Sequence, residues 1–398
     1  MYPLSVPRLR VGVNGTTVSF VTPLSGGQCY PATVVTASAP LATPRAAVSS
    51  DAGDAALAPL STGYAVGLAL TDDCNLHCAH CYRDTVDIGR LSLDDVRRLC
   101  ETIPVRSLNL GTGENGLHPE FRPALAYLRQ RGVRHTITTN SFSIGVLDDD
   151  EVRGFHSVEV SIDFPTRAEQ DAFRAEGNWD ACLAVLDRCR ALGVTTTVTA
   201  VMMSVNHDRL APIARLAADH GATFRVNVYQ PVLSDRFTLS YAQFWEGFRR
   251  LFAETEVLSC TEPLVNALLG LGGIQGPGCG RGTIRVTAKR RVLPCVYWPA
   301  AGATLGALVE DATAVTAGGE WERIRTIPKA CLPCPLVETC QGGCASRRLL
   351  AGRLDEPDEF CPIIRGDQMT LTWVRAAGRD LPKAGSACTT IVAARPST

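Results

Sequence analysis

The stretch that decides the fold is Leu70–Arg83, LTDDCNLHCAHCYR, in which Cys74, Cys78 and Cys81 are spaced as CxxxCxxC. Three thiolates this close in sequence converge on one point, and soft sulfur ligands select iron-sulfur clusters, zinc or Cu(I). A structural zinc site needs four protein ligands, and no further cysteine follows before Cys100. A four-iron cluster held by three thiolates keeps one iron open, and that iron can bind a small molecule. The spacing therefore favours an open iron-sulfur cluster, with a zinc knuckle and buried thiols as the alternatives.

Composition predicts a globular chain of two or three domains. The chain has 398 residues, of which 45% are hydrophobic and 20% charged. Its 39 basic and 40 acidic residues give a formal net charge of −1, so we expect no nucleic-acid partner. The sequence shows neither a secretory signal nor an apolar run that could span a membrane. The 16 cysteines are therefore interpreted as reduced metal ligands of a cytoplasmic protein, not as a disulfide framework.

Between residues 63 and 256, apolar strands alternate with amphipathic helices, a pattern that predicts a parallel α/β sheet. Six strands are expected, at Tyr64–Leu70, Ser107–Gly111, His135–Asn140, Ser157–Asp163, Val194–Met203 and Thr223–Tyr229. Six helices are expected, at Leu91–Ile103, Arg122–Arg131, Asp149–Phe155, Trp179–Leu192, Asp208–His220 and Tyr241–Ala253.

The two ends of the chain give weaker signals. Leu9–Val21 alternates apolar and polar residues around Asn14-Gly15, which predicts a β-hairpin. Pro31–Ser61 is rich in Ala, Pro, Ser and Thr and is expected to be a loose linker that pairs poorly with other strands. The last ~15 residues, which include Cys388, are expected to be mobile.

The cysteine triad and its setting resemble the radical S-adenosylmethionine (SAM) enzymes, whose defining element is CxxxCxxC after the first strand of a barrel. The resemblance implies a partial (β/α)6 barrel with its chemistry at the carboxyl ends of the strands. It implies that Cys74, Cys78 and Cys81 hold a SAM-binding [4Fe-4S] cluster whose electron cleaves SAM to a 5'-deoxyadenosyl radical. His80 stands where relatives place an aromatic residue near the adenine.

Other segments at predicted strand ends resemble SAM-contacting motifs of the same family. Residues 111–115, GTGEN, resemble the GGEP motif, which implies that Gly113 and Glu114 receive the SAM amino group. Thr112 replaces the first motif glycine and Asn115 the proline, so we expect the strand to bend differently here. A TTNS segment and an SxD pattern with a downstream arginine imply further SAM contacts, at Asn140, Ser161, Asp163 and Arg174. Taken alone, a surface turn or a helix cap also explains these residues.

Seven cysteines between residues 279 and 361 form a second pattern, C-x15-C, a gap of 35 residues, then C-x2-C-x5-C-x3-C-x16-C. This resembles the SPASM domain of radical SAM enzymes, although its last interval differs by one residue and Arg290 replaces a usual glycine. The resemblance implies two auxiliary [4Fe-4S] clusters. The first would use Cys279, Cys295, Cys344 and an upstream cysteine, for which Cys260 is the candidate. The second would use Cys331, Cys334, Cys340 and Cys361. A zinc ribbon and an open iron in the first cluster are the alternatives.

The resemblance predicts four segments: a β element and linker at 1–62, the barrel at 63–256, the SPASM domain at 257–370 and a tail at 371–398. It implies a radical SAM oxidoreductase that abstracts hydrogen from a ribosomally made peptide, causing oxidation, a crosslink or epimerisation. The alternative is a dehydrogenase or epimerase of a small metabolite such as an aminoglycoside, because residues 1–62 lack the helices of a leader-binding domain. A non-enzymatic iron-sulfur scaffold is a third possibility. Implied partners are flavodoxin or ferredoxin and a separate leader-binding protein. The sequence does not identify the general base; the polar residues to test near the barrel mouth are Asp72, Asp73, His118, Asp163 and Tyr229.

Overall fold

The computed structural model describes residues 17–18, 35–36, 63–271, 280–376 and 388–395. The chain divides into two compact units, Met1–Ala56 and Leu57–Thr398. In the first unit, β1 (Thr17–Val18) pairs antiparallel with β2 (Val35–Thr36). The β-branched residues of β2 thus form strand pairs, although the linker that contains them was expected to pair poorly. The remainder of the expected hairpin over Leu9–Val21 lies outside the described residues.

Six parallel strands form the middle of the sheet in the second unit, as the sequence predicts. They are β3 (Tyr64–Leu68), β4 (Val105–Leu110), β5 (His135–Thr139), β6 (Ser157–Ser161), β7 (Thr195–Met202) and β8 (Thr223–Val228). Strands that are successive in the chain are also neighbours in the sheet. Parallel neighbours need crossover connections, and helices supply them here. The α/β fold class is therefore confirmed.

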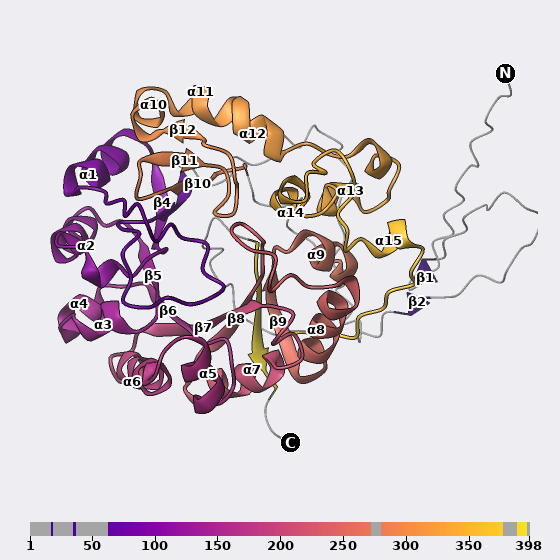
Figure 1. The fold of residues 1–398 in the computed structure, drawn as a ribbon, viewed down its shortest axis with the longest axis horizontal. Helices are drawn as coiled ribbons and strands as arrows, with labels where there is room; N and C mark the ends of the chain where they lie inside the picture. Colours follow the sequence, from indigo (N-terminus) through magenta and orange to yellow (C-terminus); the bar gives the residue numbers. More distant parts are fainter. Residues whose placement is uncertain (1–16, 19–34, 37–62, 272–279, 377–387, 396–398) are drawn as a thin grey trace, which may run out of the picture. The chain divides into compact units, whose positions relative to one another are not determined.

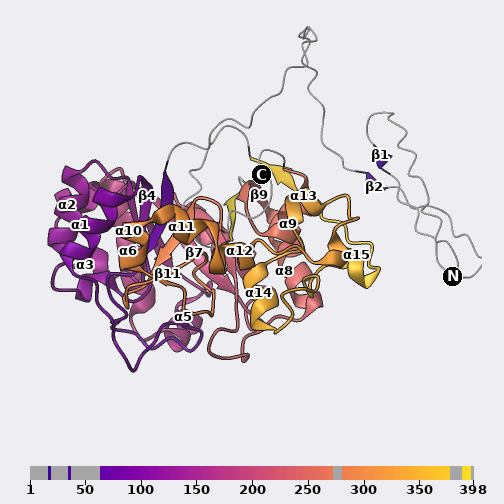
Figure 2. The same ribbon diagram turned by 90° about the horizontal axis from the view of Figure 1, so that it is seen from above.

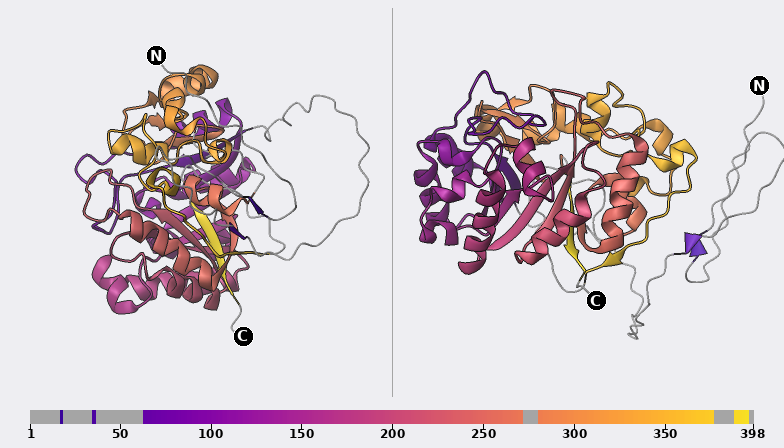
Figure 3. Two further views of the ribbon diagram at one scale, coloured as in Figure 1. Left: turned by 90° about the vertical axis from the view of Figure 1, so that its right-hand side faces the viewer. Right: turned by 60° about the horizontal axis from the view of Figure 1, so that its bottom comes forward.

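The helices of this region cover the outer side of the curved sheet (Figures 1 and 3). The described ones are α1 (Leu93–Thr102), α2 (Phe121–Gln130), α3 (Phe142–Gly145), α4 (Asp149–Arg153), α5 (Arg167–Phe173), α6 (Asn178–Ala191), α7 (Leu210–Asp219) and α8 (Tyr241–Glu254). A short 3-10 turn, η1 (Asn115–Leu117), follows β4. Ser92, Asp148 and Ser240 begin α1, α4 and α8 with capping boxes, in which side chain and backbone satisfy each other's free N–H groups.

The cysteine-rich region and the C-terminal residues extend the same sheet at both edges. At one edge β10 (Thr283–Val286) pairs parallel with β3, and β11 (Arg291–Leu293) and β12 (Ala303–Thr304) follow it. At the other edge lie β14 (Thr390–Ala394), β9 (Thr255–Cys260) and β13 (Val374–Arg375). Within the described residues, one twelve-stranded sheet thus joins the barrel to the cysteine-rich region. The segment boundary at residue 256 stays a prediction.

Short helices complete the cysteine-rich region (Figure 2). They are α9 (Pro263–Leu269), α10 (Leu305–Glu310), α11 (Ala312–Ala317), α12 (Gly319–Ile324), η2 (Lys329–Cys331), α13 (Val337–Cys340), α14 (Ala345–Leu350) and α15 (Pro362–Arg365). Helix α10 packs against α1, and α13 packs against α9. In the part of the chain that the structure describes, no helix combines the length and apolarity needed to cross a bilayer.

Arg290 forms the turn between β10 and β11 in the left-handed conformation, with φ of 58°. Its N–H donates to Thr287 O at 3.0 Å, and its guanidinium pairs with Asp95 at 2.7 Å. The conformation that a glycine would adopt without strain is therefore present even though the glycine of relatives is replaced.

The expectation of a mobile C-terminus is wrong for residues 388–395. Strand β14 runs antiparallel between β8 and β9, with Thr390 opposite both Val226 and Cys260 (Figure 1). The sequence TIVAA is β-branched and apolar, so it gains more from pairing and burial than a polar tail would. Val392 is fully buried, whereas Ile391 is partly exposed.

Replacing Val392 by Asp should lower the apparent Tm sharply, because an unpaired carboxylate inside the sheet costs on the order of 4 kcal/mol. The same substitution at Ile391 should cost much less, because the carboxylate can reach water. Thermal unfolding of the two variants, followed by circular dichroism, measures the difference. Equal melting temperatures would show that β14 is not part of the folded core.

Candidate active site

The loop after β3 carries Cys74, Cys78 and Cys81, and all three thiols line one cavity. Arg83, itself buried, holds the loop in shape by donating to Asp72 O at 2.9 Å and to Leu76 O at 2.8 Å. Burial raises the pKa of the Cys74 thiol to about 11 and also raises that of Cys78. Metal binding at these thiols would therefore release protons.

Gly113 lies against the backbone that leads into this loop. Its φ is +61°, and a Cβ there would lie 2.3 Å from Thr71 O and 2.6 Å from Asp73 O. The next residue, Glu114, donates its N–H to Asp73 O at 2.6 Å. Only glycine can make this approach, so the segment after β4 is packed directly on the loop that begins with Cys74.

Thr112 also adopts the left-handed conformation, with φ of 72°, although it is β-branched. Such a backbone is strained for threonine and persists only where its surroundings hold it. The Thr112 hydroxyl lies 2.8 Å from the Tyr82 hydroxyl and accepts a hydrogen bond from Arg285. Arg285 belongs to β10, so the cysteine-rich region helps to hold this turn of the barrel.

Glu114 is buried and organises the loop after β5. Its carboxylate accepts hydrogen bonds from the Thr139 hydroxyl, from Asn140 N at 2.9 Å and from Ser143 N at 2.7 Å. Burial raises the pKa of Glu114 despite these donors. The Asn140 amide in turn donates to Asn75 Oδ1 at 2.9 Å and lies 3.6 Å from Cys74 Sγ. Glu114 therefore positions a side chain that contacts the first cysteine.

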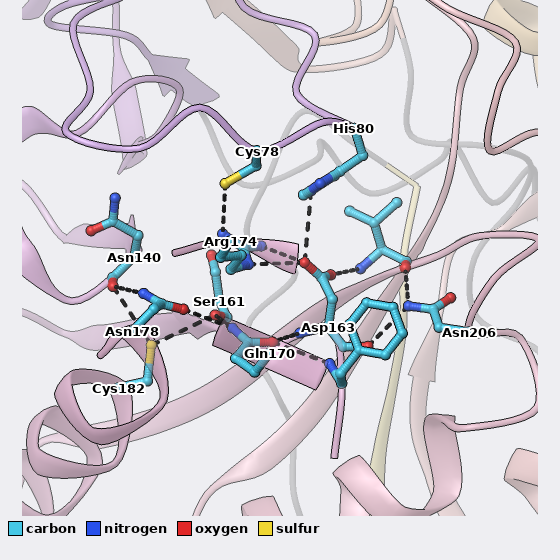
Figure 4. Close-up of polar contacts among 12 residues, drawn as sticks. Cys78, His80, Asn140, Ser161, Asp163, Gln170, Arg174, Asn178, Cys182 and Asn206 are labelled. Carbon is cyan, nitrogen blue, oxygen red and sulfur yellow. Dashed lines mark hydrogen bonds and ion pairs between the residues drawn. The ribbon is translucent and has the colours of Figure 1, made fainter. Parts of the chain in front are cut away.

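Asp163 and Arg174 form a buried ion pair, and His80 and Cys78 lie beside it (Figure 4). Asp163 Oδ2 accepts from Arg174 Nε at 2.9 Å and Nη2 at 2.7 Å, while Oδ1 accepts from Val201 N at 2.9 Å. Arg174 Nη1 reaches to 3.9 Å from Cys78 Sγ. Burial would raise the pKa of Asp163, but Arg174, His80 and the Val201 N–H outweigh it and hold that pKa below its usual value.

His80 stacks on Phe173, with ring centroids 5.0 Å apart, and its Nε2 lies 3.8 Å from Asp163 Oδ2. Burial lowers the pKa of His80 to about 4. The Asp163 carboxylate acts to raise this pKa, whereas the Arg174 guanidinium acts to lower it. The imidazole is therefore neutral near pH 7. Its Nδ1 is buried without a hydrogen-bond partner, so it can serve a ligand in the cavity.

The structure brings almost all of the expected SAM-site residues to one cavity. Its lining includes the three cysteines with His80, Gly113, Glu114, Asn140, Ser161 and Arg174. Asp163 is fully buried behind Arg174 and is absent from the lining. The other polar residues expected near the barrel mouth, Asp72, Asp73, His118 and Tyr229, do not line this cavity.

The lining residues that the sequence analysis missed include Tyr82, Glu159, Arg225, Arg285 and Tyr297. Arg225 Nη1 on β8 donates to Glu159 Oε1 on β6 at 2.6 Å. Strands β6 and β8 therefore present a buried ion pair to the cavity. Each residue stands between apolar neighbours in its predicted strand, Glu159 in SVEVS and Arg225 in TFRVNV. Because neighbouring residues of a strand face opposite sides of the sheet, this alternation could have indicated that both charges face the same side. Arg285 and Tyr297 could not be found that way, because they come from the cysteine-rich region.

The second set of cysteines, Cys331, Cys334, Cys340 and Cys361, lies in and beside the short helices η2, α13 and α15, where the Cys334 N–H donates to Cys331 O at 3.0 Å. Burial raises the pKa of Cys331 and Cys340, and the neighbouring Cys361 thiol raises both further. Among the described residues, no three His, Cys, Asp or Glu side chains are close enough to bind one metal ion together. A four-iron cluster does not require such closeness, because each thiolate binds a different iron. Among the described cysteines none is in a disulfide.

Cys260, Cys295 and Cys344, three of the four thiols expected at the first auxiliary cluster, are buried. Cys279 lies outside the described residues. The Cys344 N–H donates to Asp358 Oδ2 at 2.8 Å. Arg347 pairs with Asp358 at 2.5 Å and with Glu262 at 2.9 Å, so one buried guanidinium ties α14 to the segment after β9.

Comparison with protein families supports the sequence interpretation. Residues 68–217 match the family model described as the radical SAM superfamily. Mycofactocin maturase MftC of Mycolicibacterium smegmatis is 25% identical over 322 residues, which cover 73% of this chain and 81% of that protein. GTP 3',8-cyclase of Chlorobaculum tepidum is 26% identical over 269 residues, covering 58% and 78% of the two chains.

Solved structures share the fold. Streptococcus suis SuiB superposes with a TM-score of 0.59 at 15% identity, covering 76% of this chain and 77% of that one. A second structure, anSMEcpe with bound AdoMet and the Cp18Cys peptide, gives a TM-score of 0.58 at 16% identity and covers 75% and 94%. At this identity the two likenesses show the architecture alone.

Two glycine substitutions test the packing on the cysteine loop. Gly113→Ala should displace the loop, because its Cβ would overlap Thr71 O and Asp73 O. Gly132→Ala is the matched control: its φ is +65°, but nothing lies within 4 Å of the added Cβ. We expect the control to lose only about 1 kcal/mol to backbone strain. Rates of alkylation of Cys74, Cys78 and Cys81, with thermal unfolding, measure both effects. Unchanged alkylation in Gly113→Ala would show that the contact does not order the loop.

Proposed function

We propose that this chain, which is a radical SAM enzyme with a SPASM-type cysteine-rich region, abstracts hydrogen from a ribosomally made peptide. The observation that carries the proposal is the single cavity at which the CxxxCxxC thiols meet side chains from the barrel and the cysteine-rich region. The peptide class is supported by relatives of the same architecture. SuiB has been solved bound to precursor peptide SuiA, and anSMEcpe to AdoMet and a peptide.

Cys74, Cys78 and Cys81 are proposed to hold the SAM-binding [4Fe-4S] cluster. The donor set fits this group, because three thiolates leave one iron open, and the unpartnered His80 Nδ1 fits a polar edge of the adenine. When bound, the cluster and SAM supply reductive cleavage to a 5'-deoxyadenosyl radical that abstracts the hydrogen atom. Gly113, Glu114, Asn140, Ser161, Asp163 and Arg174 are proposed to shape the SAM site.

The chain's own residues orient and enclose this site. Arg174 is fixed by two hydrogen bonds to Asp163, so its charge near Cys78 stays in one place. Asp163 acts through Arg174 and through His80, which makes it a positioning residue. Glu114 holds the loop that presents the Asn140 amide to Cys74. Preorganised polar groups of this kind need no rearrangement when a substrate binds.

Two auxiliary [4Fe-4S] clusters are proposed for the cysteine-rich region. The second is assigned to the set Cys331, Cys334, Cys340 and Cys361, and the grouping of these thiols supports that assignment. The first is assigned to Cys279, Cys295 and Cys344 with one further thiol. An electron donor such as flavodoxin or ferredoxin, and a separate leader-binding protein, are proposed partners.

Replacing Cys74, Cys78 and Cys81 together by Ala should abolish formation of 5'-deoxyadenosine and leave auxiliary iron bound. The wild-type chain should bind about 12 iron and 12 sulfide after anaerobic reconstitution, and the variant about 8 of each. Iron and sulfide assays with chromatography of the nucleoside measure both. Retained SAM cleavage in the variant would contradict the cluster assignment. If the wild-type chain instead contained zinc and only about 4 iron per chain, the cysteine-rich region would be a zinc-binding domain.

The substrate class is tested with synthetic peptides corresponding to any short open reading frames found beside the gene of the enzyme, prepared with deuterium on Cα and on the side-chain carbons. We expect deuterium to appear in 5'-deoxyadenosine and the peptide mass to change, because the abstracted atom moves to the nucleoside. A peptide without that precursor sequence is the control. Transfer from a deuterated aminoglycoside instead would favour the small-metabolite alternative.

A further inference from the structure

The backbone before β14 places Cys388 at the carboxyl-end edge of the barrel sheet. Strand β14 is antiparallel to β8 and β9, so its first residues lie beside the last residues of both. Thr389 is fixed on either side: its carbonyl accepts from Thr261 N at 2.7 Å, and its hydroxyl donates to Val226 O at 3.1 Å. Arg225 Nε also donates to the Thr389 hydroxyl at 3.0 Å. Cys388, directly before this anchored residue, is therefore held beside the carboxyl-terminal halves of β8 and β9.

Cys388 belongs to the same group of thiols as Cys344 and Cys295. Burial raises the pKa of the Cys344 thiol, whereas the Arg347 guanidinium acts to lower it. The thiols of Cys388 and Cys295 are both near enough to raise this pKa further. The backbone gives the same arrangement, since Thr389 pairs with Thr261, the neighbour of Glu262. Glu262 binds Arg347, three residues after Cys344. The segments before β14 and α14 are thus linked through Glu262 and Arg347, and the thiols of Cys388 and Cys295 both lie in the neighbourhood of Cys344.

Cys260, the thiol that the sequence suggests for this cluster, has different surroundings. Its Sγ lies 3.2 Å from the Thr390 hydroxyl and 3.8 Å from Glu262 O, where it can donate a hydrogen bond. The side chain is fully buried and packs in the main apolar core. Burial raises the pKa of Cys260 to about 12, and the nearby Cys388 thiol acts in the same direction, so what sets the two thiols apart is the burial and hydrogen bonding of Cys260. Cys388, by contrast, is only partly buried, so its thiol borders less tightly packed space.

We propose that Cys388, rather than Cys260, binds iron in the auxiliary cluster that Cys295 and Cys344 serve. The thiol would lose its proton and bind one iron as thiolate. This inference rests on the proposed function, which places a cluster there. It has a structural consequence: the C-terminal strand would be tied to the cysteine-rich region through the metal, so that cluster binding would also stabilise β14.

The test compares Cys388→Ala with Cys260→Ala in the full-length chain, reconstituted anaerobically with iron and sulfide in the presence of SAM. Both variants retain the CxxxCxxC triad, so differences between them arise at the auxiliary clusters. After mild oxidation with ferricyanide, Cys388→Ala should lose about one more iron per chain than wild type, because an iron without a thiolate leaves a cluster readily. It should also show the electron paramagnetic resonance signal of a three-iron cluster. Cys260→Ala should behave as wild type.

Two outcomes would overturn the inference: the extra loss of iron in Cys260→Ala alone, or wild-type behaviour of Cys388→Ala. If wild type itself binds only about 4 iron, the auxiliary clusters of the proposed function fail instead. Maleimide labelling of the wild-type chain is a second measurement in case Cys388→Ala misfolds. Reconstitution should protect Cys388 and leave Cys100, a partly buried thiol on α1, as reactive as before. Equal labelling of Cys388 with and without the cluster would also contradict the proposal.

Discussion

The site depends on one close contact, the approach of Gly113 to the carbonyls of Thr71 and Asp73. These oxygens lie only 2.3 Å and 2.6 Å from the position that a Cβ would occupy, so they leave room for a hydrogen atom alone. The contact fixes the segment after β4 against the cysteine loop, and Glu114 then carries the constraint to the loop after β5. A local steric condition thereby sets the relative positions of three strand ends. Carboxyl ends of parallel strands are suited to this, because they converge at one edge.

Buried ion pairs fix further elements of the structure relative to one another. Asp163 with Arg174 joins β6 to α5, Glu159 with Arg225 joins β6 to β8, and Arg347 joins α14 to two acidic residues. Removing one partner of such a pair leaves an uncompensated charge and costs about 3–5 kcal/mol, although the intact pair adds little net stability. Their value here is geometric, because each pair holds a charge or a backbone segment beside a thiol or the cavity.

The sequence predicted the parallel sheet, the six central strands and the three-cysteine loop because periodicity and spacing are local signals. Thr112 and Arg290 show a limit of that reasoning: each replaces an expected glycine, yet tertiary contacts hold both in the left-handed conformation. Strand β14 shows another limit. A short apolar segment near a chain end resembles a tail, and its partners are distant in the chain, with Thr390 and Cys260 separated by 130 residues. The residues near Cys388, such as Thr261 and Cys344, could not be predicted for the same reason, because they too are distant from it in the chain.

The cysteine-rich region and the barrel are best understood as one mechanical unit. Arg285 from β10 binds the strained Thr112, and Tyr297 packs edge-on against Tyr82, directly after Cys81, with centroids 5.3 Å apart. Both contacts join residues near the second cysteine constellation to residues beside the first. A substrate in the cavity would therefore touch side chains from both regions at once. Because the two regions share a continuous sheet, their spacing is set by backbone hydrogen bonds and not by a flexible linker. Such a rigid frame suits radical chemistry, in which the reacting carbon must be held near one face of the cofactor and away from water.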